Sequence, residues 1–221
     1  MILTIPKNAF FVFDLDDTLY KEIDYLTSAY RSIATALLPE IGRDIYEEMI
    51  QLHKNRESTF DVIKDKYNFT MQIEDMVAIY RFGTPVIKLS PGAEGLLTNL
   101  FQQRIPMGLL TDGRSQSQRN KLAALKIDLF FLLIIISEEF GSEKPNRANY
   151  TEFSDKYPGH KFFYVADNLN KDFITPNQLG WTTIALNDDG SNIHKVKSKL
   201  TLEYLPTYKI DRLGDIQLLV E

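Results

Sequence analysis

The sequence predicts an α/β fold with a doubly wound parallel sheet and a small all-helical insertion after the first strand. Two observations predict the sheet: short runs of residues that are apolar on both faces recur along the chain, and helical patterns separate several of them. Such runs suit parallel strands that helices cover on each side, and this alternation is typical of α/β folds. The third observation is the stretch from about residue 20 to residue 85, which contains no convincing strand pattern.

The expected strands are five short apolar runs. In chain order they are Phe10–Phe13, Pro106–Thr111, Leu132–Ile136, Lys161–Ala166 and Thr182–Leu186. The helices expected between them are Gly92–Gln103, Ser115–Leu125 and Arg147–Lys156. Residues 208–220 are expected to close the fold with one more strand and a helix. In sheets of this type, function concentrates at the carboxyl ends of the strands.

The insertion is predicted to be a bundle of four short helices, because its apolar residues recur at helical spacing. The pattern of the first helix consists of Ile23, Leu26, Tyr30, Ile33, Ala34 and Leu37. Pro39 is expected to end this helix. The pattern continues over 45–52, 60–67 and 73–80. We therefore expect residues 1–20 and 86–221 to form a core domain, and residues 21–85 to form a helical cap.

The bulk composition indicates a globular protein without a nucleic-acid-binding surface. Of 221 residues, 44% are hydrophobic and 25% charged, the net charge is −5 and the pI is about 5.3. Binding nucleic acid over a broad surface needs a clustered basic face. The longest apolar run, Leu129–Ile136, is far below the roughly 20 residues of a membrane span, and no signal peptide is expected. The lack of cysteine excludes disulfides and suits a reducing cytoplasm, the expected location.

Carboxylates follow the first expected strand. Asp14 and Asp16 come directly after the apolar run, and side chains two apart in an extended backbone point the same way, so both can converge on one ligand. A buried strand that ends in charges is costly unless a divalent metal or a substrate phosphate compensates them. A turn followed by a helix cap explains the same pattern equally well when it is taken alone.

Polar groups also follow the next three expected strands. Thr111-Asp112-Gly113 offers a hydroxyl and backbone N–H groups to a phosphate. Lys144 offers a positive charge. Asp167 and Asp172 complete an oxygen-rich nest suited to Mg²⁺. Turn chemistry or a solvated loop explains each group separately, but their joint order at four successive strand ends favours a functional site.

In the order of these motifs the chain resembles the haloacid dehalogenase (HAD) superfamily, whose Rossmann-like members are mostly phosphohydrolases. Asp14–Thr18 matches the first motif, Leu110-Thr111 the second, Lys144-Pro145 the third, and Asp167 with Asp172 the fourth. The helical insertion resembles the type 1 cap of that superfamily. One small departure is Ala166, at a position where relatives often have glycine.

The resemblance implies a Mg²⁺-dependent phosphomonoesterase that acts on a small phosphorylated metabolite, either a sugar phosphate or a nucleoside monophosphate. Asp14 is expected to be the nucleophile that forms an aspartyl-phosphate, and Asp16 the general acid and base. The residues expected to bind the phosphoryl group are Thr111, Asp112, Gly113 and Lys144. The expected metal ligands are Asp14, Asp167 and the backbone carbonyl of Asp16, with Asp172 orienting Asp167 or a water ligand.

Alternatives of three kinds stay open. A phosphomutase uses the same aspartyl-phosphate and passes the phosphoryl group to another acceptor. A haloacid dehalogenase shares the nucleophile, but halide leaves without a proton and the family's dehalogenases lack the second aspartate, which is present here as Asp16. A phospho-accepting signalling domain places its phosphorylated aspartate after an internal strand, unlike the order found here.

The helical insertion also offers candidates for substrate recognition. Tyr25 or Tyr30 could stack on a base or a sugar, although a place in the core of the insertion is the simpler interpretation. The sequence contains no signal for an oligomeric state.

Overall fold

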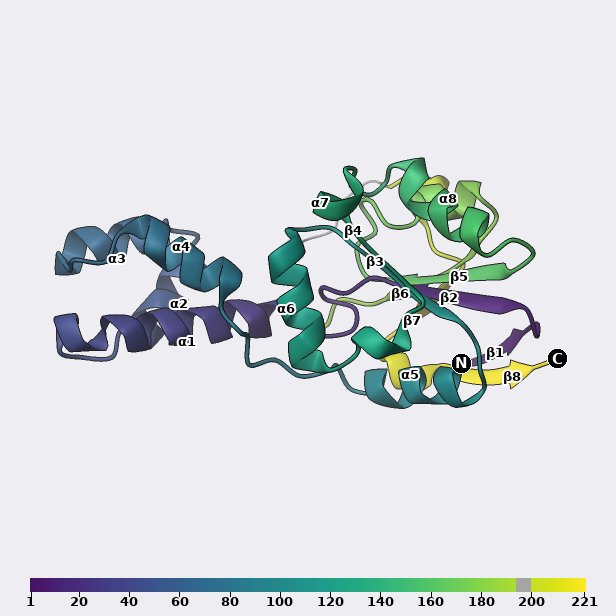
Figure 1. The fold of residues 1–221 in the computed structure, drawn as a ribbon, viewed down its shortest axis with the longest axis horizontal. Helices are drawn as coiled ribbons and strands as arrows, with labels where there is room; N and C mark the ends of the chain where they lie inside the picture. Colours follow the sequence, from purple (N-terminus) through teal and green to yellow (C-terminus); the bar gives the residue numbers. More distant parts are fainter. Residues whose placement is uncertain (194–199) are drawn as a thin grey trace.

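The computed structural model describes residues 1–193 and 200–221, and it contains a parallel sheet of six strands in the order β4-β3-β2-β5-β6-β7. These strands are β2 (Ala9–Phe13), β3 (Met107–Thr111), β4 (Leu133–Ile136), β5 (Lys161–Ala166), β6 (Thr182–Leu186) and β7 (Tyr208–Ile210). A separate parallel pair joins the two ends of the chain, β1 (Ile2–Ile5) and β8 (Gln217–Val220). The doubly wound α/β fold expected from the sequence is confirmed (Figure 1).

The strand order places a topological switch point between β2 and β5. From β2 the chain builds outward through β3 to β4, and it then returns to pair β5 with the other side of β2. The helices that follow these two neighbouring strands therefore diverge, and a crevice opens at the carboxyl ends of the strands. Asp14 follows β2 and Asp167 follows β5, so both aspartates lie at this crevice.

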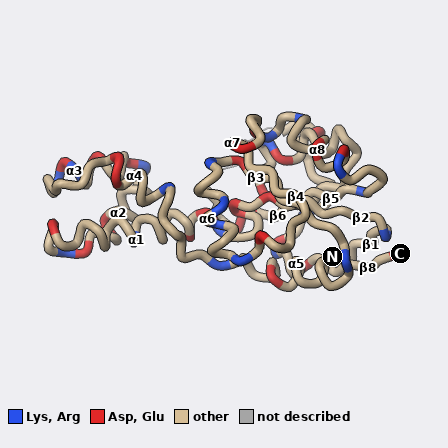
Figure 2. The backbone as a smooth tube through the Cα atoms, in the orientation of Figure 1, with Lys and Arg blue, Asp and Glu red and all other residues tan. Residues whose placement is uncertain are grey.

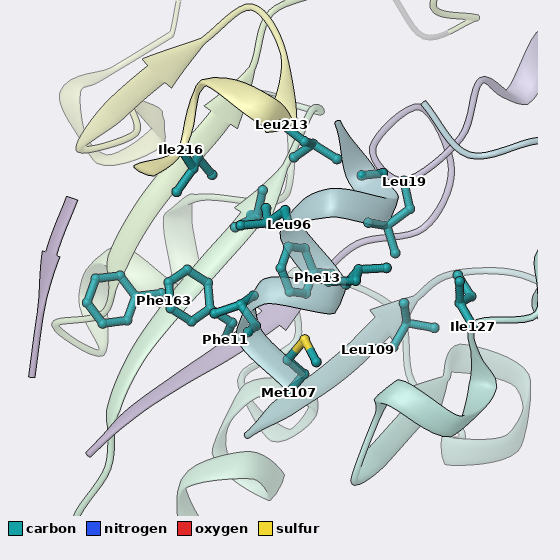
Figure 3. Close-up of a cluster of buried hydrophobic side chains, with 14 of the residues drawn as sticks. Phe11, Phe13, Leu19, Leu96, Met107, Leu109, Ile127, Phe163, Leu213 and Ile216 are labelled. Carbon is teal, nitrogen blue, oxygen red and sulfur yellow. The ribbon is translucent and has the colours of Figure 1, made fainter. Parts of the chain in front are cut away.

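Both faces of the sheet are buried, which explains why its strands are continuous apolar runs. Phe11 and Phe13 point to one face with α5 (Ala93–Gln102) and α6 (Ser115–Leu125), as Figure 3 shows for part of that cluster. Phe10 and Val12 point to the other face, which α8 (Arg147–Lys156) covers. Alternate residues of a strand face opposite sides, so the central strand β2 contributes side chains to both hydrophobic cores.

The insertion between β2 and β3 is helical, as expected. It consists of α1 (Glu22–Ile41), α2 (Tyr46–Lys54), α3 (Thr59–Tyr67) and α4 (Ile73–Phe82). These four helices enclose a hydrophobic cluster of their own, which includes Ile33, Leu37, Met49, Ile63 and Met76. Figure 1 shows them to one side of the sheet, with α6 between the two parts.

The prediction that Pro39 ends the first helix is wrong. The helix continues to Ile41, with Pro39 inside its last turn. A proline removes one helical N–H donor from this turn, but the helix continues past it for two more residues. Gly42 ends the helix, because it adopts a left-handed conformation (φ 76°) and donates its N–H to Leu38 O at 2.9 Å.

The carboxyl-terminal segment also differs from the expectation of a strand followed by a helix. After β7 the chain makes only a 3₁₀ turn, η3 (Leu213–Asp215), and then forms β8. The strand β1, the partner of β8, was not expected from the sequence. Its burial alternates between exposed and buried, so it lacks the continuous apolar pattern of the central strands. The short helices α7 (Ser137–Phe140) and α9 (Ile174–Gln178) were missed as well.

Among the described residues, no helix combines the length and the apolar composition needed to cross a bilayer.

We predict that Gly92→Ala destabilises the protein by about 2–4 kcal/mol, because the position is both strained and crowded. Gly92 precedes α5 at φ 85°, and a Cβ there would lie 2.2 Å from the backbone N of Gly214 in η3. The control is Gly95→Ala, inside α5, where a Cβ meets nothing within 4 Å; it should stabilise by about 0.5–1 kcal/mol. Urea unfolding measures both, and equal effects would contradict the packing of α5 on η3.

Candidate active site

The strand ends that the sequence singled out converge on one cavity. The backbone N of Asp14 donates to Val165 O at 2.9 Å, which extends the pairing of β2 with β5 by one residue and fixes where the Asp14 side chain begins. The cavity at this edge has a volume of about 220 Å³. Its charged lining consists of Asp14, Asp16, Asp17, Glu22, Asp112, Glu143, Asp167 and Asp172, together with Lys144 and Lys171. The charge of the lining is therefore strongly negative before any ligand binds.

Lys144 lies at the centre of this site, between two carboxylates. Its Nζ is 2.6 Å from Asp14 Oδ1 and 2.8 Å from Asp172 Oδ1. The residue is only 6% exposed. Burial disfavours the charged form, but the carboxylates of Asp14 and Asp172 outweigh it and raise the pKa of Lys144 well above its usual value. The ammonium group is therefore charged at neutral pH and fixed against Asp14.

One ammonium group does not neutralise all the carboxylates around it. Ligand oxygens of Asp14, Asp167 and Asp172 lie within 4.8 Å of one another. Burial raises the pKa of Asp14 to about 6 even with Lys144 beside it, and burial together with the charge of Asp14 raises the pKa of Asp167 to about 9. Carboxylate oxygens are the ligands that hard divalent cations prefer. The donor set and its excess negative charge therefore fit such a cation.

The Asp16 carboxylate is held by residues of α6. Lys121 Nζ lies 2.6 Å from Asp16 Oδ1, and Gln118 Nε2 donates to Asp16 Oδ2 at 2.7 Å. Tyr20 OH donates to Asp16 Oδ1 as well. Burial alone would raise the pKa of Asp16, but Lys121 and these hydrogen bonds lower it below its ordinary value. Asp16 is therefore an ionised acceptor in this arrangement.

The hydrogen bonds of the segment after β3 differ from those expected from the sequence. Thr111 Oγ1 accepts a hydrogen bond from Gln118 Nε2 at 2.5 Å, so Thr111 lies at the site. The N–H of Gly113, expected to face phosphate, instead donates to Ser137 Oγ at 2.9 Å. It is therefore already used in this conformation. Ser137 begins α7, a helix that the sequence did not reveal.

Asp112 has a bridging place between two lysines. Its Oδ1 accepts from the backbone N of Lys144 at 3.0 Å, and its Oδ2 is 2.6 Å from Lys171 Nζ. Asp112 thus contacts Lys144 through a backbone hydrogen bond and Lys171 through a salt bridge, and its carboxylate adds no positive charge for a phosphate. The geometry indicates instead that Asp112 positions Lys144 and Lys171 at the cavity.

Several residues of the site were not expected from the sequence, among them Gln118, Lys121 and Lys171. A signal for Gln118 was present, since it occupies the i position of an i, i+4, i+7 stripe with Leu122 and Leu125, all three of them buried. A glutamine on a buried stripe needs a hydrogen-bond partner. Lys171 carried no such signal, because its contact with Asp112 spans 59 residues.

The two tyrosines proposed for stacking belong to the interior. Tyr25 OH donates to Tyr80 O at 2.6 Å, and Tyr30 OH donates to Thr59 Oγ1 at 3.3 Å. Both tyrosines are buried. Tyr30 therefore belongs to the core of the insertion, as the simpler interpretation has it, whereas Tyr25 packs in the core of the sheet domain.

The doubly wound sheet carries a buried lysine among carboxylates at its switch point, the place where ligands bind in α/β proteins. Residues 11–186 match the haloacid dehalogenase-like hydrolase family, and the chain belongs to that family. The family resemblance inferred from the motifs is therefore confirmed.

Two relatives and one solved structure are similar to the chain over most of its length. Over 191 residues the chain is 28% identical to a glyceraldehyde 3-phosphate phosphatase of Methanocaldococcus jannaschii, covering 79% of this chain and 83% of the relative. It is 27% identical over 191 residues to the protein of that name in Methanopyrus kandleri, covering 79% and 82%. The HAD-hydrolase YfnB of Bacillus subtilis, crystallised bound to magnesium, matches with a TM-score of 0.64 at 21% identity, covering 93% of this chain and 95% of that one.

We predict that Asp167→Asn raises the melting temperature in EDTA, and raises it more at about pH 8 than at about pH 5. A carboxyl whose pKa rises from 3.8 to about 9 takes up a proton on folding. Its stabilising contribution is complete below about pH 4 and is lost as the pH rises toward 9. Asparagine removes this dependence at nearly the same volume. A gain of equal size at both pH values would contradict the electrostatic account of Asp167.

Proposed function

We propose that the protein is a Mg²⁺-dependent phosphomonoesterase that hydrolyses a small sugar phosphate through an aspartyl-phosphate on Asp14. The observation that carries the proposal is the placement of Asp14: a buried carboxylate 2.6 Å from the Lys144 ammonium, in a cavity that also holds Asp16. The glyceraldehyde 3-phosphate phosphatases among its relatives support phosphate esters as substrates.

The proposed ligands of the ion are Asp14, Asp167 and the backbone carbonyl of Asp16, while Asp172 orients the site through Lys144. Asp172 is fully buried, and it also accepts from the backbone N of Asn168 at 3.1 Å. When bound, the ion neutralises the carboxylates and stabilises negative charge on the transferring phosphoryl group. Magnesium is proposed because it prefers oxygen ligands and because the similar YfnB hydrolase was crystallised bound to magnesium.

Asp14 acts as the nucleophile in this proposal. One of its carboxylate oxygens forms a bond to phosphorus while the bond from phosphorus to the leaving oxygen breaks. With a pKa near 6, Asp14 is mostly ionised at neutral pH. Lys144 offsets the repulsion between this anion and the anionic phosphate. Thr18 Oγ1 donates to Asp14 Oδ2 at 3.1 Å and helps to hold the carboxylate in place.

Asp16 is the general acid and the general base in this proposal. As an acid it gives a proton to the leaving oxygen, and as a base it then takes a proton from the water that attacks the phosphorus and displaces Asp14. Beside Lys121 the carboxylate is ionised, which is the state required of the base. To act as the acid, Asp16 must turn away from Lys121 and carry a proton. The need for an acid also separates this chemistry from dehalogenation, because halide leaves without a proton.

The cavity favours a small substrate. Its volume of about 220 Å³ accommodates a phosphate group and a body of a few carbon atoms. Lys171 lies at this cavity with its side chain 33% exposed, so it can reach a ligand. The burial of Tyr25 and Tyr30 removes the stacking surface that was considered for a nucleotide. A sugar phosphate is therefore our proposal over a nucleoside monophosphate.

We propose that residues 21–85 form a cap that closes over this cavity, while residues 1–20 and 86–221 form the catalytic core. Glu22, the first residue of α1, lines the cavity, so the insertion reaches the site. The two connecting segments lie together, since the backbone N of Ser90 donates to Leu19 O at 2.8 Å. Figure 2 shows charged segments of both signs where α6 lies between the helical block and the sheet.

The direct test is a panel of phosphorylated metabolites assayed for phosphate release with Mg²⁺ and with EDTA. The panel should include glyceraldehyde 3-phosphate, other sugar phosphates and nucleoside monophosphates. We expect phosphate release from the small sugar phosphates, and its loss in EDTA. Isomerisation of a sugar phosphate without phosphate release would indicate a mutase, and undiminished activity in EDTA would contradict the metal assignment.

We predict that Asp14→Asn lowers kcat by a factor of about 10³ or more, because an amide cannot replace the nucleophilic carboxylate. The control is Asp61→Asn in α3, the same substitution at an exposed position of the insertion. It should leave kcat unchanged. Circular dichroism and melting temperature establish that both variants are folded, and a folded Asp14→Asn protein with full activity would contradict the nucleophile assignment.

Asp16→Asn should act selectively on substrates with poor leaving groups. An alkyl phosphate needs a proton on its leaving oxygen, whereas p-nitrophenolate leaves readily without one. We predict a loss of about 10²–10⁴-fold for phosphorylation of the enzyme by an alkyl phosphate, and a much smaller loss with p-nitrophenyl phosphate. Burst-phase kinetics measure this step, and equal losses with both substrates would contradict the role of Asp16 as the acid.

A further inference from the structure

Asn192 bridges a lysine and an aspartate of the candidate site. It lies in the loop that follows β6, and it is only 5% exposed although its side chain is polar. Its Nδ2 donates to Asp167 Oδ2 at 2.8 Å, and its Oδ1 accepts from Lys21 Nζ at 2.9 Å. A buried amide with both ends bonded is held in one orientation.

The chemistry of the two partners fixes which end of the amide faces which residue. A lysine ammonium group has only donors, so it must face the amide oxygen. The amide nitrogen of Asn192 must then face Asp167, where it donates to the carboxylate. Lys21 is held in turn by Asp189 Oδ1 at 3.1 Å. The chain of contacts therefore runs from Asp189 through Lys21 and Asn192 to Asp167.

The loop has one internal hydrogen bond at Asn192 and is anchored to another element at the next residue. The backbone N of Asn192 donates to Asp188 Oδ1 at 3.0 Å. The next residue, Ile193, donates its backbone N to Asp17 Oδ2 at 3.2 Å. Asp17 directly follows Asp16 in the motif after β2. The loop after β6 is thus hydrogen-bonded, on the far side of the switch point, to the segment that carries the proposed nucleophile and acid.

We propose that Asn192 is a positioning residue that fixes the carboxylate of Asp167 for the divalent cation, with Lys21 fixing the amide of Asn192. This inference rests on the proposed function, because it assigns Asp167 as a ligand of the ion. Hydrogen bonds to a ligating carboxylate orient it, and their loss weakens metal binding. Asp167 accepts from Asn192 on one oxygen, so the plane of its carboxylate is set before an ion binds.

Lys21 connects this arrangement to the proposed cap. It directly precedes α1, and it is therefore the first residue of the proposed cap. The position of the segment that leads into the cap is linked to the orientation of Asp167 through a single amide. Substitution of Lys21 should therefore affect metal binding, although Lys21 does not contact Asp167 itself.

The experiment measures Mg²⁺ binding by calorimetry, without substrate, on the full chain. Asn192→Leu removes the donor at similar volume and should weaken Mg²⁺ binding by about 10–100-fold. The matched control is Asn187→Leu, the same substitution in the same loop, at an exposed residue that donates to Asp211. It should bind Mg²⁺ as the parent does. With saturating Mg²⁺, Asn192→Leu should regain most of the parent kcat, which a general loss of structure would not allow.

Lys21→Met tests the same chain of contacts without substituting Asn192, and it is the deciding variant if Asn192→Leu fails to fold. It should weaken Mg²⁺ binding in the same direction by a smaller factor. Adding Asn192→Leu to Asp167→Asn should cause no further loss of affinity, because the amide then has no carboxylate to orient. Parent-like affinity in folded Asn192→Leu, or in Lys21→Met if only that variant folds, would overturn the inference while leaving the proposed function intact. Absence of Mg²⁺ binding by the parent would overturn both.

Discussion

The structure depends on an imbalance of charge at one edge of its sheet. The Lys144 ammonium group lies within 2.8 Å of both Asp14 and Asp172, yet a third carboxylate, Asp167, shares the same space. Burial of this excess negative charge is unfavourable, and the raised pKa values of Asp14 and Asp167 express that cost. The apolar strands behind these residues stabilise the fold and hold the carboxylates together against their repulsion. A bound cation relieves the repulsion between these carboxylates, so the same feature that weakens the fold favours cation binding.

Helix α6 connects the parts of the molecule that must act together. On one side, Gln118 and Lys121 bind the Asp16 carboxylate. On another, Ser117 and Asn120 donate to backbone carbonyls at the end of α4 and just beyond it, where the helical insertion returns to the core. The residues that hold Asp16 and those that contact the insertion are thus neighbours on one rigid helix. A displacement of the insertion that moves α6 would also move the donors that keep Asp16 ionised.

The sequence could predict those features of the fold and the site that follow from local patterns and sheet topology. The convergence of Asp14 and Lys144 followed from their places after parallel strands, whose carboxyl ends share one edge. The contacts of Asn192 and of Gln118 could not be predicted in this way, because they depend on how a loop and a helix pack across the switch point. The pairing of β1 with β8 joins the two ends of the chain, and no local pattern reveals such a partner. Pro39 misled the prediction because a proline disfavours a helix without always ending it, and here the left-handed Gly42 ends α1 instead.

The central claim is that phosphorus is transferred to the carboxylate of Asp14. The measurement that tests it most directly is acid quenching of the enzyme during turnover of a sugar phosphate with Mg²⁺, followed by mass spectrometry of its peptides. The account predicts a phosphoryl group on Asp14 that forms and disappears at rates matching turnover. Turnover that proceeds with the phosphoryl group on a different residue, or with no phosphorylated enzyme at any time during a burst of product, would contradict it.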